Sequence, residues 1–277
     1  MKLSDAGELG LLRELESRGL IEGTEHDAAQ LSDGLVVTQD ALVEGVHFRL
    51  DRLCWRELGF RAAAINISDL AASAARPEAL LVTLGLPGEI EVGDVVALYE
   101  GLGEPGVPVR GGDTTRASEV VISVTALGRS ERVPGRAGAR PGDRIVVTGP
   151  LGGAGAAFRA GRYVRPPLRV EEGLLLGRVA TAMLDVSDGI AVDAGHLARR
   201  SGCRLVIDLD AIPLGGTLDD LGFGEDFELL AATSDPLDFP VIGRCEDGEG
   251  VLLLHDGEPI ELRGYEHFTR ESDPRTQ

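Results

Sequence analysis

The chain has a seam near its middle, the stretch RVPGRAGARPG at Arg132 to Gly142, which is rich in Gly, Pro and Arg. This composition is typical of a connection between structural units rather than of a helix or a strand. A chain of 277 residues is long enough for two domains of ordinary size. We therefore expect an N-terminal domain over residues 1–136 and a C-terminal domain over residues 137–277.

Short β-rich runs and helical patterns alternate on both sides of the seam. Six runs, most of them bounded by Gly, Pro or Asp, predict strands. They are Leu35–Thr38, Leu80–Leu86, Val120–Leu127, Arg144–Thr148, Leu205–Leu209 and Val251–Leu254. Apolar residues at helical spacing predict helices over Arg61–Ala75, around Val92–Tyr99 and around Ile190–Ala198. This mixture favours an α+β fold over a regular βαβ repeat.

The chain is strongly acidic, with 27 basic and 46 acidic residues and a formal net charge of −19. Such a surface repels phosphate backbones and anionic lipids, so we expect neither nucleic acid nor a membrane as a partner. Lys2 is the only lysine. A P-loop, a protein-kinase site and a Schiff-base enzyme each need a lysine in the site, so all three are excluded.

The cysteines indicate a reducing compartment. Cys54, Cys203 and Cys245 are far apart and form no CxxC pair, so neither a disulfide framework nor a zinc knuckle is expected. The first ten residues contain no apolar signal-peptide core, and no apolar run approaches the roughly 18 residues of a membrane span. We therefore expect a cytoplasmic protein.

Five aspartates occupy places that are unusual for surface charge. They are Asp40 at the end of the apolar run LVVTQ, Asp69 in the Ala-rich helix with Asn66, Asp113 after a double glycine, and Asp185 and Asp188 at a strand-to-helix junction. A single such residue is more often a helix cap or a solvated turn residue. Five that converge would be costly to bury without a cation, so the set predicts a divalent-metal site.

The chemistry of such a metal site indicates a substrate that carries phosphate groups. Carboxylates without lysines suit hard cations, and Mg²⁺ bridges readily to substrate phosphates. The string GGDTT at Gly111–Thr115 fits this interpretation, because two glycines let backbone N–H groups approach a phosphate while Asp113 holds the metal. The residues alone indicate nucleotide-dependent phosphoryl transfer and go no further.

Six longer strings occur in a fixed order along the chain. They are TQDALVEGVHF at Thr38–Phe48, NISDLAA at Asn66–Ala72, GGDTT at Gly111–Thr115, DVSDG at Asp185–Gly189, GEDFELL at Gly224–Leu230 and GYEHF at Gly264–Phe268. Together they resemble the thiamine-monophosphate kinase family, of the superfamily that includes aminoimidazole ribonucleotide synthetase. The resemblance runs from about Gly7 to Phe268, which is nearly the whole chain.

The resemblance implies a fold and a reaction. The N-terminal domain would bind ATP and Mg²⁺ and contribute half of an intersubunit β-barrel in a homodimer, and a C-terminal α+β domain would complete the active site. The reaction would be direct, in-line transfer of the ATP γ-phosphoryl group to thiamine monophosphate, giving thiamine diphosphate. Several Mg²⁺ ions would be the cofactors.

The resemblance also implies roles for single residues. The metal ligands would be Asp27, Asp40, Asp69, Asp113, Asp185 and Asp188. The residues that contact ATP would be Tyr99, Gly112, Asp113, Arg136 and Ser187. The substrate contacts would be His47, Glu225 and Tyr265. The catalytic set would be Asp113, Arg136 and Asp188. On their own surroundings, His47 could equally be structural, Arg136 a solvated arginine and Tyr265 a core anchor.

The chain departs from the family pattern in places. Glu25-His26-Asp27 stands where the family carries Gly-Asp-Asp, and Gln39 replaces a small hydroxyl residue before Asp40. The stretches before Gly224 and between Asp235 and Pro240 are shorter than is typical of the family. Two alternatives therefore stay open: a catalytically weakened ATP-binding paralogue, and another ATP-dependent reaction of the same superfamily.

Overall fold

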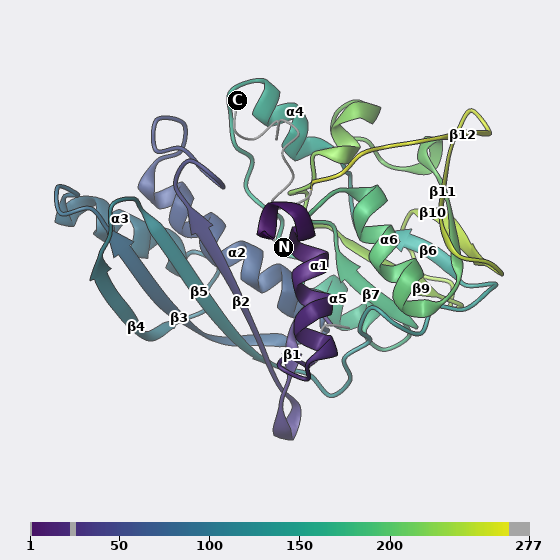
Figure 1. The fold of residues 1–277 in the computed structure, drawn as a ribbon, viewed down its shortest axis with the longest axis horizontal. Helices are drawn as coiled ribbons and strands as arrows, with labels where there is room; N and C mark the ends of the chain where they lie inside the picture. Colours follow the sequence, from purple (N-terminus) through teal and green to yellow (C-terminus); the bar gives the residue numbers. More distant parts are fainter. Residues whose placement is uncertain (1, 23–25, 266–277) are drawn as a thin grey trace.

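The computed structural model describes residues 2–22 and 26–265, which form two β-sheets with helices packed against them (Figure 1). One sheet has five strands in the order β1-β2-β5-β3-β4, and the other has seven in the order β12-β11-β8-β10-β6-β9-β7. The first lies wholly before the Arg132–Gly142 seam and the second wholly after it. The α+β class is confirmed, whereas the division at residue 136 stays a prediction.

The N-terminal sheet is mostly antiparallel. Its strands are β1 (Ala29–Gln30), β2 (Leu35–Val43), β3 (Arg76–Leu86), β4 (Val109–Arg116) and β5 (Val121–Arg129). Strand β5 pairs antiparallel with both β2 and β3, and β4 pairs parallel with β3 at the outer edge. Buried and more exposed residues alternate along β5, so the sheet covers a core on one face and leaves the other face open.

Helix α2 (Trp55–Ala72) packs on the core face of this sheet, and α3 (Val92–Gly103) packs against α2. They cross closely, because a Cβ atom at Gly59 would lie 1.9 Å from the carbonyl oxygen of Leu98, and one at Gly101 would lie 1.9 Å from that of Arg56. Glycine is therefore required at both positions of the crossing. Helix α2 is buried along almost its whole length.

The C-terminal sheet and helix α6 (Ile190–Ser201) enclose a second hydrophobic core between them. Its strands are β6 (Arg144–Val147), β7 (Ala182–Asp185), β8 (Arg204–Asp208), β9 (Leu229–Thr233), β10 (Val241–Glu246), β11 (Gly250–His255) and β12 (Glu258–Ile260). Helix α6 packs on β7, β8 and β11 through the apolar stripe that includes Ile190, Ala194 and Leu197. The shorter helices are α4 (Gly153–Arg159), α5 (Val170–Leu176), η1 (Ser32–Gly34), η2 (Leu209–Ala211) and η3 (Leu218–Gly222).

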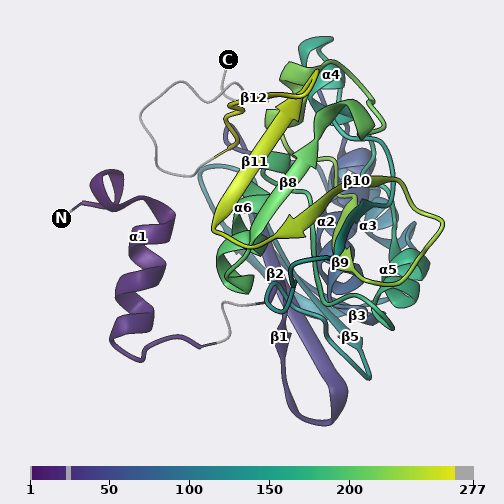
Figure 2. The ribbon, with the colours of Figure 1, turned by 90° about the vertical axis from the view of Figure 1, so that its right-hand side faces the viewer.

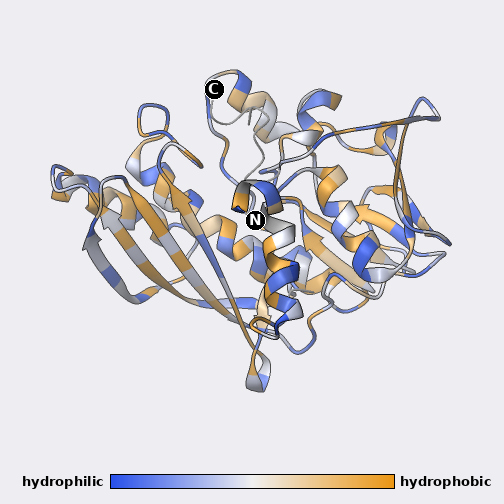
Figure 3. Cartoon of the chain, in the orientation of Figure 1, coloured by the Kyte–Doolittle hydropathy of each residue, from blue (hydrophilic) through white to orange (hydrophobic). Residues whose placement is uncertain are grey.

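Helix α2 also joins the two halves. Its C-terminal end packs against α5, β7 and β9, and Ala71 and Ala72 share an apolar cluster with Met183 and Leu229. Hydrophobic residues accordingly run along α2 and the strands on both sides of it (Figure 3). This packing places Asp69, near the end of α2, beside the end of β7.

Helix α1 (Leu3–Ser17) lies to one side of this body, as Figure 2 shows. An ion pair of 3.4 Å between Glu16 and Arg200 links it to α6. None of the helices in the described ranges is both long and apolar enough to span a bilayer.

The sequence predictions of elements are confirmed with local corrections. All six predicted strands and all three predicted helices are present. The Ala-rich helix ends at Ala72 rather than Ala75, and Asp40 lies within β2 rather than at its end. The GGDTT string forms part of strand β4, which the sequence analysis did not predict, because glycines and a charged residue obscure the alternation of a strand.

Candidate active site

Four of the predicted metal ligands lie together where α2 passes between the two sheets. Carboxylate oxygens of Asp27, Asp69 and Asp185 all lie within 4.8 Å of one another. Asp40, on β2, lies close enough to Asp69 for each carboxyl group to shift the pKa of the other. We call these four residues the aspartate cluster. Its members come from the segment before β1, from β2, from α2 and from the end of β7, so only the folded chain brings them together.

Neighbouring polar side chains hold the cluster in place. The Thr38 hydroxyl donates to Oδ2 of Asp69 at 2.6 Å, and the Ser68 hydroxyl donates to Oδ2 of Asp185 at 2.5 Å. The Asn66 side chain accepts the backbone N–H of Asp40 at 3.1 Å and donates to the carbonyl of Ala62. Thr38 and Ser68 were missed by the sequence analysis, although each lies within one of the quoted strings.

A single arginine, Arg136, forms an ion pair with the cluster in the described part of the chain. Its Nε donates to Oδ1 of Asp27 at 2.8 Å, and the Asp27 side chain is only 2% exposed. The seam stretch that carries Arg136 therefore folds back onto the site. Glu25, the first residue of the altered Glu25-His26-Asp27 string, lies outside the described residues.

The carboxyl groups of the cluster resist ionisation. Burial, together with the charges of Asp188 and Asp27, raises the pKa of Asp40 to about 6. Burial and the charge of Asp27 raise the pKa of Asp185 to about 8. The pKa of Asp69 is raised well above its ordinary value by burial and by three neighbouring aspartates. The cluster thus carries more negative than positive charge, and a bound cation would neutralise this excess.

The loop after β7 adds Ser187 and Asp188. The backbone N–H of Asp188 donates to Oδ2 of Asp193 at 3.0 Å, and Asp193 is itself buried in the first turn of α6. Burial and the charges of Asp188 and Asp185 raise the pKa of Asp193 well above its ordinary value. The sequence analysis missed this residue, although an aspartate in the apolar run IAVDAGHL was the available signal.

Glu225 and Tyr265 contact the same loop through their backbones. The N–H of Glu225 donates to the carbonyl of Ser187 at 2.8 Å, and that of Tyr265 donates to the carbonyl of Asp188 at 2.9 Å. Glu225 has a φ of +60° and forms a buried ion pair of 2.5 Å with Arg61 of α2. Backbone strain at a buried charge is typical of functional positions. The rest of the GYEHF string, residues 266–268, lies outside the described residues.

His47 lies in the turn after β2. Its Nδ1 accepts the backbone N–H of Val43 at 3.0 Å, and its own backbone N–H donates to the Val43 carbonyl at 2.9 Å. This contact fixes the ring and assigns the proton to the other ring nitrogen when the imidazole is neutral. The arrangement serves the turn, and whether His47 also contacts a substrate stays a prediction.

Three predicted site residues lie away from the cluster. Asp113 and Gly112 are exposed on β4, and Tyr99 is 38% exposed on α3. Strands β5 and β3 separate β4 from β2, so at about 4.8 Å per strand spacing Asp113 lies roughly 14 Å from Asp40. Gly112 has a φ of +149°, and a Cβ atom there would lie 1.7 Å from the carbonyl oxygen of Val82. Its glycine therefore serves the close pairing of β4 with β3.

Comparison with known proteins identifies the class. Residues 25–130 match the family model of the AIR synthase related protein N-terminal domain, and residues 140–254 match that of the C-terminal domain. Two sheets joined by α2, with aspartates gathered at the junction, thus define an AIR synthase related protein.

Full-length relatives give the particular family. The chain is 33% identical to the thiamine-monophosphate kinase of Aquifex aeolicus, over 97% of this chain and 100% of that one. It is 32% identical to that of Pyrococcus horikoshii, over 84% and 86%. A solved structure described as "AaThiL complexed with AMPPCP and TMP" superposes with a TM-score of 0.89 at 31% identity, covering 96% of this chain and 99% of that one. The chain belongs to the thiamine-monophosphate kinase family.

Proposed function

We propose that the protein transfers the γ-phosphoryl group of ATP to thiamine monophosphate and releases thiamine diphosphate and ADP. Family membership supports this reaction, as does the similar structure described with AMPPCP and TMP. The observation that carries the proposal is the aspartate cluster, in which carboxyl groups from four separate segments meet within reach of one arginine.

The donor set of the cluster fits Mg²⁺. All four donors are carboxylates, and hard oxygen ligands of this kind select Mg²⁺ over softer metals. Asp27, Asp40, Asp69 and Asp185 would hold the metal, with Asp188 in the adjoining loop. The chemistry that Mg²⁺ supplies at such a site is neutralisation of charge on phosphate oxygens.

Other residues of the chain would orient the phosphates. Arg136 lies against Asp27 and is the cation best placed to stabilise charge that develops on the transferred group. Ser187 and Asp188 share the loop that follows β7. No general base is required, because the phosphate of thiamine monophosphate already presents an anionic oxygen as the nucleophile. In-line attack by that oxygen then needs positioning rather than proton transfer.

A second copy of the chain would complete the site. In the described sheet β1 pairs with only Val36 and Val37 of β2, which leaves the β2 edge beyond them open near Asp40. Strand β4 is an exposed edge, and Leu81 on the open face of the sheet is 40% exposed. Joining β4 of one copy to β2 of another would close the two sheets into a barrel and bring Asp113, Gly112 and Tyr99 to the partner's cluster.

Subunit mixing tests this homodimer. Asp69→Asn and Asp113→Asn chains should each be inactive as pure dimers, and a one-to-one mixture should recover about a quarter of wild-type activity, since half of the dimers then carry one intact site. Co-expression with two affinity tags isolates the mixed dimer. No recovery, or full activity of the Asp113→Asn chain alone, would contradict the shared site.

The reaction itself is tested by single-turnover transfer from γ-labelled ATP to thiamine monophosphate, with Mg²⁺ varied and EDTA as the control. Labelled thiamine diphosphate that appears only with Mg²⁺ supports the proposal. ATP binding without transfer would instead favour a weakened paralogue. ATP consumption that depends on a different acceptor would favour another reaction of the superfamily.

The remaining expectations accompany this reaction. A cytoplasmic location is supported by three free cysteines, two of them buried. A domain boundary near Arg136 is supported by the gap between the two family matches at residues 130 and 140.

A further inference from the structure

A pocket lies apart from the residues assigned to the reaction. It has a volume of about 350 Å³ and lies between the N-terminal end of α2 and the segment 161–166. The residues that matter below are Arg52, Phe60, Arg61, Arg162, Tyr163 and Arg165, and we call this site the arginine pocket. None of the predicted ligands of metal, ATP or thiamine monophosphate lines it. Its size is at the small end of the range for small-molecule sites.

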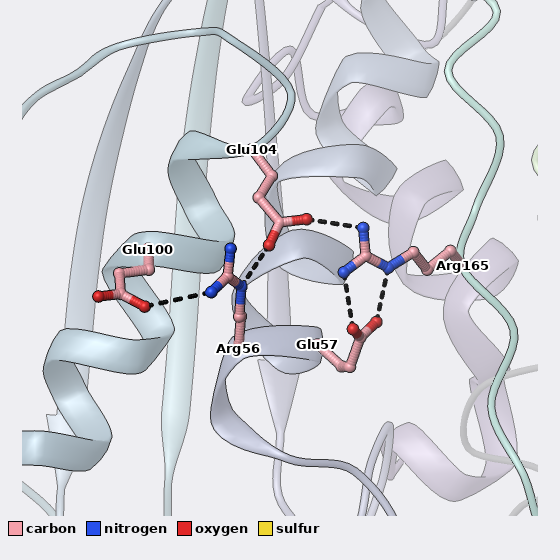
Figure 4. A network of polar contacts seen from close by, with 5 residues as sticks. All are labelled: Arg56, Glu57, Glu100, Glu104 and Arg165. Carbon is pink, nitrogen blue, oxygen red and sulfur yellow. Dashed lines mark hydrogen bonds and ion pairs between the residues drawn. The ribbon is translucent and has the colours of Figure 1, made fainter.

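The charge of the pocket is opposite to that of the chain. Arg165 is neutralised by Glu57 at 2.6 Å and by Glu104 at 2.6 Å (Figure 4), and Arg61 is neutralised by Glu225. In the described ranges no carboxylate lies within ion-pair distance of Arg52 or Arg162. Two unbalanced cations therefore border one pocket of a protein whose net charge is −19. The local field attracts anions that the rest of the surface repels.

Three of the four guanidinium groups of the pocket, those of Arg52, Arg61 and Arg165, are stacked on aromatic rings before any ligand binds. The Arg165 group lies 4.3 Å from the ring centre of Phe60, the Arg61 group 5.4 Å from that of Tyr163, and the Arg52 group 5.7 Å from that of Phe158. Stacking on a ring restricts an arginine, so it loses less entropy when it binds an anion.

Arg61 also has an unused donor. Its side chain is 5% exposed, and its buried Nε–H finds no acceptor. A buried donor without a partner carries a cost that an acceptor in the adjoining pocket would remove. Arg61 thus lines the pocket beside Arg52 and Arg162 with part of its hydrogen-bonding capacity unused.

We propose that the arginine pocket binds a phosphate-bearing anion, at a site separate from the aspartate cluster. Several guanidinium groups match the several charged oxygens of a phosphate group better than the two oxygens of a carboxylate. The occupant would lie against Arg61, whose partner Glu225 is hydrogen-bonded to Ser187 beside the cluster. The site is therefore placed to couple phosphate binding to the geometry of the loop at Ser187.

Cys54 reports on the pocket directly. It lines the pocket and is exposed, whereas Cys203 and Cys245 are buried. The rate of Cys54 alkylation by iodoacetamide, an uncharged reagent, should fall when the pocket is occupied. The probes are inorganic phosphate, inorganic diphosphate and thiamine diphosphate, each with EDTA in place of Mg²⁺ and at constant ionic strength. Without metal, binding at the aspartate cluster is suppressed.

The expected slowing is about tenfold when a probe is present at ten times its dissociation constant. It should be lost in Arg52→Ala/Arg162→Ala and kept in Arg52→Lys/Arg162→Lys, which preserves the charge. Arg178→Ala removes another exposed arginine, one that does not line the pocket, and should behave as wild type. Melting curves show that each variant is folded.

The pattern among the probes identifies the source of the anion. Slowing by all three supports a site for the phosphate group itself, and slowing by thiamine diphosphate alone supports a site for an organic phosphate. The proposal is overturned if no probe slows alkylation. It is also overturned if the slowing is the same in Arg52→Ala/Arg162→Ala.

Discussion

The aspartate cluster and the ion-pair network around Arg165 are both built from charged side chains, but their charges balance differently. In the network, Arg56 and Arg165 alternate with Glu57, Glu100 and Glu104 on the surface between α2, α3 and the segment before α5 (Figure 4). In the cluster four aspartates meet, and Arg136 is the arginine that pairs with them in the described residues.

The difference separates a structural role from a functional one. Each glutamate of the network has an arginine within ion-pair distance and stays accessible to water, so the network needs nothing from outside the chain. The cluster concentrates negative charge in a largely buried place, which opposes folding unless protons or cations neutralise it. Such a cost is expected where a metal is bound during catalysis.

The largest effect is expected from removing one charge of the cluster. Asp69→Asn should lower single-turnover transfer by about 10³-fold, because one of the proposed metal ligands is lost. It should also raise the melting temperature in EDTA at pH 8.5 by about 3 °C, since fewer like charges are then confined together. Activity and calorimetric melts check both effects.

Asp247→Asn is the matched control, because Asp247 is exposed and far along the chain from the cluster. It should change neither quantity. If Asp69→Asn kept wild-type activity, or lost stability in EDTA at this pH, the interpretation of the cluster would be wrong.

A second prediction concerns pH. The raised pKa values of Asp40, about 6, and Asp185, about 8, mean that the folded chain holds protons that the unfolded chain has released. Without metal, the contribution of these two groups to the free energy of unfolding should therefore be greatest below about pH 4. It should decrease as the pH rises towards 8. The dependence should be weaker in Asp185→Asn.

Mg²⁺ should reverse this trend. Metal binding requires ionised carboxylates, so the rise in melting temperature caused by Mg²⁺ should grow from pH 5 to pH 8.5. Thermal melts at several pH values, with Mg²⁺ or EDTA, provide the measurement. A stabilisation by Mg²⁺ that is independent of pH would contradict the proposed ionisation of the cluster.

The smallest effects are expected in the network. Glu100→Gln removes an exposed contact of 3.5 Å and should shift the melting temperature by less than about 1 °C. Glu104→Gln breaks contacts with both Arg56 and Arg165 and should lower it by about 2 °C. Transfer activity should be unchanged in Glu100→Gln. A large loss of activity there would show that the network does more than hold α2 and α3.

The sequence predicted the parts of the site that follow from local patterns. Asp69 was notable because a charge in an Ala-rich helix is unusual, and Asp185 because it ends an apolar strand; both lie in the cluster. Asp193 escaped notice because a polar residue in the first turn of a helix is ordinary. Its significance comes from a hydrogen bond to Asp188 and from burial under other elements.

The other features of the site could not be predicted, because they depend on how distant segments of the chain pack together. The strings containing Asp40 and Asp113 look equivalent in sequence, but strand order places them on opposite sides of β5 and β3. Only pairing across the sheet reveals this separation, and pairing of strands depends on contacts distant along the chain. The Arg61–Glu225 ion pair could likewise not be predicted from the sequence, since its two residues are 164 positions apart.

Calorimetric titration of the metal-free protein with Mg²⁺ at pH 7, in two buffers of different ionisation enthalpy, tests the central claim most directly. With a pKa of about 8, Asp185 is mostly protonated at this pH, so binding should release about one proton per cluster from this group. The release should be smaller in Asp185→Asn, because only the protons held by the other carboxyl groups of the cluster, such as Asp69, are then displaced. Absence of Mg²⁺ binding, or binding with the same heat in both buffers, would contradict the account of the cluster as a metal site.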